Sequence, residues 1–187
     1  MKSLSRLGTR PASLPLAADD VLEFHAARLL LLMYICGTAG RIDGLTKMAK
    51  LDFFTRYPDF FEAARAAVEP EAQTVPVDRA DAVESSMVRH HYGPWDKRYY
   101  QVLAHLEARR LITVSKLKNS YQIALSTEGA EKAKALAKRP SFATLVERQK
   151  AVKKTFGGKS GTVLKTLIYK LFDEEVGKRT LGQVITK

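Results

Sequence analysis

The order helix, β-hairpin, helix within residues 92–136 constrains the fold of this chain more than any other feature. Asp96 is a suitable N-cap for the first helix, whose apolar residues recur at helical spacing. Two runs rich in β-branched residues and tyrosine follow at 112–117 and 121–125, and Ser126 or the threonine after it caps the second helix. Because an isolated hairpin is only marginally stable, we expect these strands to pack against helices.

The first helix of this segment is amphipathic, with an apolar stripe formed by Tyr99, Val102, Leu103 and Leu106. Side chains that are polar or basic occupy the start of the helix and its opposite face: Lys97, Arg98, Gln101, His105 and Arg109. Such a face is also typical of an ordinary solvated helix. The hairpin favours a binding role, because its tip carries two lysines and its whole length contains no acidic residue.

Two motifs in this segment resemble winged-helix transcription regulators of the MarR and PadR kind. One is the helix end Val102–Ile112, which leads into the hairpin, and the other is the turn Leu125–Gly129, which opens the next helix. The resemblance covers about 50 of the 187 residues. Arg110 departs from the pattern, since many relatives have glycine there.

The resemblance implies a mainly α-helical fold with a small β-hairpin, a winged helix-turn-helix core and appended C-terminal helices. It further implies a non-catalytic regulator that binds double-stranded DNA as a homodimer and needs no cofactor. The helix would face the major groove through Lys97, Arg98, Gln101, His105 and Arg109. Lys116 and Lys118 on the wing would contact phosphate or the minor groove.

The net charge of +11 is concentrated in the second half of the chain. Residues 85–125 contain seven Lys and Arg against two Asp and Glu, and residues 126–187 contain 14 against six. Concentrated basic charge indicates a polyanionic partner. RNA or an anionic membrane would attract the same charge, so charge alone does not identify DNA.

We divide the chain into a basic N-terminal arm at 1–18, a winged-helix domain at 19–139 and a C-terminal helical extension at 140–187. An acidic, proline-containing insert interrupts the domain at about 69–84. The extension contains two expected helices, at 141–154 and 162–172. They are suited to a dimer interface, to a different protein subunit or to an extension of the basic surface.

The first third of the chain predicts three helices, at about 21–35, 45–57 and 60–68, with turns expected at 41–44 and 92–95. The second helix should direct three basic side chains outward: Lys47, Lys50 and Arg56. The phenylalanines of the second and third helices should lie in the core. Trp95 should anchor the proposed DNA-contacting helix against that core.

Sequence motifs for catalysis or metal binding are weak. Gly158-Lys159-Ser160 lacks the upstream glycine and strand of a P-loop, and His90-His91 has no partner at metal-ligand spacing. Cys36 lies among apolar residues, which favours a buried core thiol. The acids at positions 43, 52 and 59 are expected to be caps and surface charges, so we expect no enzyme.

The apolar run at 26–36 is too short to cross a bilayer, and we expect a cytoplasmic protein without membrane contacts. An alternative function is a winged-helix adaptor for protein interactions, such as an antitoxin-like component of a multi-subunit bacterial system. The unfamiliar C-terminal helices keep that alternative open.

Overall fold

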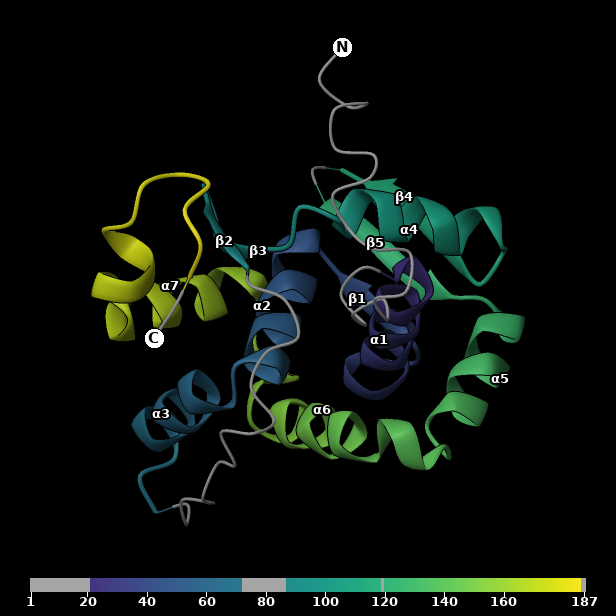
Figure 1. Ribbon diagram of the computed structural model, residues 1–187, viewed down its shortest axis with the longest axis horizontal. Coiled ribbons are helices and arrows are strands. Elements are labelled where there is room, and N and C mark those ends of the chain that lie inside the picture. Colours follow the sequence, from purple (N-terminus) through teal and green to yellow (C-terminus); the bar gives the residue numbers. More distant parts are fainter. Residues whose placement is uncertain (1–20, 72–86, 119, 186–187) are drawn as a thin grey trace, which may run out of the picture.

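The structure is a computed structural model that describes residues 21–71, 87–118 and 120–185. This part of the chain is mainly helical with a small antiparallel sheet (Figure 1). The predicted arm at 1–18 and most of the predicted insert at 69–84 lie outside the described residues.

Helix α1 (Leu22–Cys36) is the central helix of the fold. Five consecutive residues, Leu29 to Met33, are buried, so the helix is covered on all sides along this stretch. The helices α2, α4, α5 and α6 all pack against it. Cys36 is buried at its end, as predicted, and burial raises the pKa of its thiol to about 12.

The main sheet contains β1 (Arg41–Asp43), β5 (Ser120–Leu125) and β4 (Ile112–Leu117), in that order. The turn predicted at 41–44 is wrong, because these residues form an edge strand that pairs antiparallel with β5. Ile42 lies opposite Ile123, and both side chains are buried. A three-residue strand is too short to show an alternating pattern, and its partner lies some 80 residues away in the sequence.

Helices α2 (Leu45–Arg56) and α3 (Pro58–Val68) follow β1 directly. Proline at the first position of α3 provides a preset φ angle and ends α2 two residues earlier. The four phenylalanines of these helices are buried, as predicted: Phe53, Phe54, Phe60 and Phe61.

A second, two-stranded sheet joins β2 (Val88–His90) to β3 (Gly93–Trp95). The turn predicted at 92–95 is therefore displaced, since the chain reverses at His91 and Tyr92 and Gly93 already pairs with His90. Gly93 has a φ of 95°, a conformation that favours glycine.

Helix α4 (Tyr99–Ala108) leads into the β4–β5 hairpin, and α5 (Thr127–Leu136) follows it. The Ser126 side chain caps α5 by accepting the Gly129 backbone N–H at 2.9 Å. Gly129 is required there because a Cβ atom would lie only 1.9 Å from the Leu111 carbonyl oxygen. Arg110, where the resemblance predicted glycine, has a φ of 57°.

The C-terminal part contains the short 3₁₀ turn η4 (Pro140–Phe142), α6 (Ala143–Phe156), α7 (Gly161–Leu171) and the π-helical turn η5 (Asp173–Gly177). The two predicted helices are present. Their side chains enter the same core as those of α1 and α2, and Phe156 stacks on Phe54 with ring centroids 4.5 Å apart. The segment predicted as an extension is thus integral to the core.

Candidate nucleic-acid interface

The outward face of α4 carries the predicted polar residues near its middle and end. Gln101 and Arg109 are exposed and His105 is partly buried, whereas the predicted apolar stripe faces the core. Helical periodicity produces this division, because residues three and four apart share a face. These three side chains are therefore available to a partner on one side of the helix.

The β4–β5 hairpin lies beside α4 (Figure 1). Lys116 and Lys118 are both exposed, and Lys118 takes a positive φ of 53° where the hairpin turns. The Glu107 carboxylate accepts the Val114 backbone N–H at 2.9 Å, which joins the end of α4 to the outer edge of β4. This bond holds the Glu107 carboxylate beside β4, while the charged side chains at the hairpin tip are both lysines.

The start of α4 differs from the prediction. The helix begins at Tyr99 rather than at Lys97, and Asp96 accepts the Arg98 backbone N–H at 2.9 Å. Lys97 is exposed. Arg98 is not presented freely to solvent, because its guanidinium Nε lies 3.0 Å from Asp96 and its Nη1 lies 2.9 Å from His25. The structure thus separates Arg98 from the group of side chains predicted to face DNA.

A buried polar network surrounds this end of α4. Two carboxylates, Asp52 of α2 and Asp96 before α4, lie among arginines from three segments of the chain. Arg28 of α1 contacts Asp52 at 3.1 Å, and Arg56 of α2 contacts Asp96 at 2.8 Å. Buried charges are stable only when they are paired and hydrogen-bonded, and each carboxylate here meets that condition.

Tyr99 connects the network to the first turn of α4. Its hydroxyl donates to the Asp52 carboxylate at 2.7 Å, and its ring meets Trp95 edge-on at 5.0 Å. Trp95 is 7% exposed and also stacks on His90, which confirms the predicted anchoring role. Burial, followed by the nearby Asp52 charge, raises the pKa of Tyr99 well above its ordinary value.

The electrostatics of Asp96 follow from this packing. Burial alone would raise the pKa of its carboxyl group, but hydrogen bonds from Arg98 and the charge of Arg56 outweigh burial. The pKa of Asp96 is therefore held well below its usual range. Asp96 stays ionised, and the network fixes the start of α4 against α1 and α2.

Two residues predicted to point outward from α2 are instead buried. Arg56 is 5% exposed and belongs to the network, and Lys50 is fully buried, donating to the Pro94 carbonyl oxygen at 2.9 Å. Burial and the nearby Lys165 charge lower the pKa of Lys50 to about 7. The prediction failed because it assumed that α2 has one solvated face, whereas β3 and α7 cover that face.

The described residues contain no group of three metal-ligating side chains placed to hold a metal ion. Ser160, from the P-loop-like Gly158-Lys159-Ser160, instead caps α7 by accepting the Val163 backbone N–H at 3.3 Å. His90 and His91 contact each other through their rings.

No helix within the described ranges has both the length and the apolar character needed to cross a bilayer.

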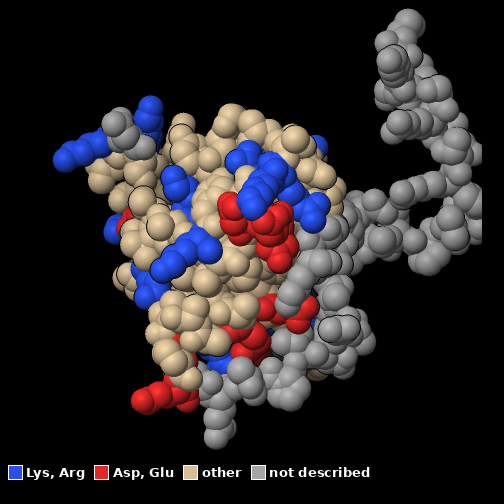
Figure 2. All heavy atoms as spheres, turned by 90° about the vertical axis from the view of Figure 1, so that its left-hand side faces the viewer, with Lys and Arg blue, Asp and Glu red and all other residues tan. Residues whose placement is uncertain are grey.

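The charge on the side of the molecule that carries α3 and α7 is mixed. Figure 2 shows lysine and arginine side chains in separate groups, with acidic side chains gathered between and below them. The turn η5 alone contributes three acids: Asp173, Glu174 and Glu175. On this side of the molecule, the basic residues of the C-terminal third therefore do not form a continuous basic surface.

Sequence reasoning missed His25 and Arg28 as members of the buried polar network. The expectation that Asp52 is a cap or surface charge is wrong, because Asp52 is fully buried within the network. The only sequence signal of these three residues is their charge within apolar helices, where an unpaired charge would be costly. Their partners lie as far as 73 positions away. Comparisons of the chain with known protein families, with curated proteins and with solved structures gave no match.

Proposed function

We propose that this protein binds double-stranded DNA without catalysis, through α4 and the β4–β5 hairpin, as a regulator of transcription. The observation that carries the proposal is the outward face of α4, where Gln101 and Arg109 are exposed and His105 is partly buried, beside a hairpin tip with Lys116 and Lys118. Arginine and glutamine can read base edges, and lysines contact phosphates.

The arrangement of elements supports a winged-helix core for this proposal. Helices α1, α2 and α4, the β4–β5 hairpin and helix α5 follow one another in the predicted order of helices and wing, and strand β1 lies between α1 and α2. Helix α3 and the β2–β3 hairpin are then an insertion between the second and third helices of the core. The sheet order β1-β5-β4 places the proposed wing beside the strand that follows α1.

The dimensions of α4 suit this role. Ten helical residues extend about 15 Å, and the major groove of B-DNA, about 12 Å wide, admits an α-helix. We further propose that two copies bind two half-sites, by analogy with the winged-helix regulators that the sequence resembles. Half-site centres about 34 Å apart would then give the tightest binding.

The residue roles are tested by DNA-binding titrations of single variants. Arg109→Ala should weaken binding to a preferred site by roughly 10-fold and relax its sequence preference, because a bidentate base contact contributes about 1–3 kcal/mol. Lys118→Ala should weaken binding to every duplex similarly and lower the salt slope by about 1. Lys134→Gln removes one exposed charge from α5 and serves as the control. If Arg109→Ala and Lys118→Ala both bind like wild type, the proposed docking is wrong.

A further inference from the structure

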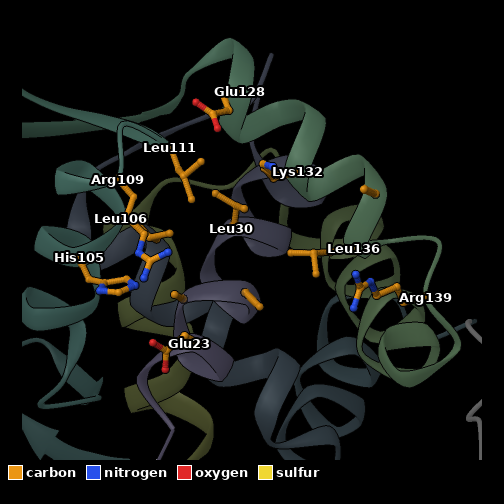
Figure 3. A pocket seen from close by; sticks show the side chains of 13 residues that line it. Glu23, Leu30, His105, Leu106, Arg109, Leu111, Glu128, Lys132, Leu136 and Arg139 are labelled. Atoms are coloured by element: carbon orange, nitrogen blue, oxygen red, sulfur yellow. The ribbon is translucent and has the colours of Figure 1, made fainter.

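A groove with a volume of about 550 Å³ lies between α1, α5 and the end of α4 (Figure 3). The groove is open to solvent along one side. None of the motifs found in the sequence predicted it. Its size lies within the range of small-molecule sites, which are mostly apolar with a few polar groups that orient the ligand.

The floor of the groove is aliphatic. Leucines from α1, α4 and α5 and from the link to β4 point into it: Leu30, Leu106, Leu111 and Leu136. Alanines from α1 and α5 form the remaining floor and leave the space open. Among the described residues, no phenylalanine, tyrosine or tryptophan lines the groove, so an alkyl chain matches this surface better than a flat aromatic ring.

The rim carries three permanent cations, Arg109, Lys132 and Arg139, against two carboxylates, Glu23 and Glu128. Across the described part of the chain, the side chains of Lys132 and Arg139 have neither a hydrogen bond nor an ion pair. Both are therefore available to a ligand. An excess of cations above an apolar floor complements a ligand with a negative head and an apolar body.

The two ends of α5 differ in charge. Figure 3 shows Glu128 near one end of this helix and Arg139 beyond the other, next to Leu136. Arg139 lies three residues beyond the end of α5 and eleven positions after Glu128. Lys132 lies between the two along the chain. Arg109 belongs also to the face of α4 proposed to contact DNA, so the anionic head is assigned to α5.

We propose that this groove binds a free medium-chain aliphatic carboxylate, with the alkyl chain on the leucine floor and the carboxylate at Arg139 and Lys132. This inference does not depend on DNA binding, because direct titration of the ligand tests it. Each methylene group buried on binding should tighten the dissociation constant by roughly 4-fold.

Isothermal titration of the full chain with hexanoate, octanoate and decanoate, below micelle formation, tests the proposal. Affinity should rise by roughly 15-fold for each pair of methylenes, and decyltrimethylammonium should bind at least 10-fold more weakly than decanoate. A flat chain-length series, or equal binding of the ammonium compound, would overturn it. So would binding only to vesicles of phosphatidylcholine and phosphatidylglycerol without binding of free decanoate.

Matched variants locate the site. Lys132→Gln with Arg139→Gln should weaken decanoate binding at least 10-fold, whereas Lys134→Gln with Lys138→Gln removes the same charge from exposed positions outside the groove and should not. Ala135→Leu should also weaken binding, because its larger side chain fills groove volume while retaining high helix propensity. Circular dichroism verifies that each variant is folded. Equal effects of both charge pairs, or full affinity in Ala135→Leu, would contradict the assignment.

Discussion

The guanidinium of Arg56 lies 2.8 Å from the carboxylate of Asp96, and both side chains are almost completely buried. This ion pair joins the end of α2 to a residue three positions before α4. Arg98 contacts the same carboxylate from the other side, so one buried acid holds the start of the proposed DNA-contacting helix. The orientation of α4 is consequently set by the interior of the protein.

The first prediction concerns this carboxylate. Asp96→Asn should lower the free energy of unfolding by about 3 kcal/mol, because buried arginines would lose their charged partner. Urea denaturation at pH 7 measures the change. Asp43→Asn is the control, since the pair between Asp43 and Arg41 is about half exposed and should contribute less than about 1 kcal/mol. A loss below 1 kcal/mol in Asp96→Asn would show that the network does not depend on this charge.

Arg98→Ala separates the positioning role of this residue from direct DNA contact. The variant should lower stability, and its weaker DNA binding should appear equally with every duplex, because α4 is held less firmly. Thermal unfolding and titration with two unrelated duplexes measure both effects. Unchanged stability together with altered sequence preference would restore Arg98 to the DNA-contacting face.

The lowered pKa of buried Lys50 predicts that the free energy of unfolding depends on pH. Its pKa is lowered to about 7 in the folded protein, whereas an unfolded lysine keeps a value near 10.5, so the unfolded state binds more protons between these limits. Stability should therefore rise with pH from about 7 to about 10, at about 1.4 kcal/mol per unit in the middle of this window.

Lys50→Met isolates this contribution. Urea denaturation of wild type and variant at pH 7, 8 and 9 should show that the variant lacks the rise, after subtraction of the titrations that both proteins share. Methionine retains the apolar bulk of the site but has no titratable group. The same slope in both proteins would mean that Lys50 remains protonated in the folded state.

From the positive φ angle of Arg110 we predict that a single substitution at this position stabilises the protein. Arg110 is exposed and has a φ of 57°, a conformation that is unfavourable for residues with a Cβ atom and costless for glycine. Arg110→Gly should raise the free energy of unfolding by about 0.5–1 kcal/mol, whereas Arg110→Ala, which removes the same charge, should not. Denaturation midpoints compare the two. Equal stabilisation by alanine would attribute the effect to charge.

Local signals in the sequence predicted most of the helices and the β4–β5 hairpin. Apolar periodicity locates α4, Gly37 and Pro58 mark the ends of α1 and α2, and Ser126 marks the start of α5 through its capping side chain. These features depend on residues within a few positions of one another, so they are visible without the fold. The turn motif also predicted Gly129, although the reason for glycine there is a contact with Leu111, 18 positions earlier in the chain.

Long-range contacts account for what the sequence did not predict. Strand β1 exists because β5 pairs with it, and Lys50 is buried because elements distant in sequence cover α2. Arg98 shares the helical face of Gln101 by periodicity alone, yet Asp96 and His25 bind it. A charge pattern indicates which side chains can bind a partner, but the fold determines which are already engaged.

The central claim is tested most directly by fluorescence anisotropy of the wild-type protein with labelled duplex DNA. Random duplex and the DNA upstream of the protein's own gene are each titrated at two salt concentrations. The account predicts salt-sensitive binding to both, with tighter binding to the upstream DNA. Absence of binding to either duplex at low salt would contradict DNA binding despite the net charge of +11.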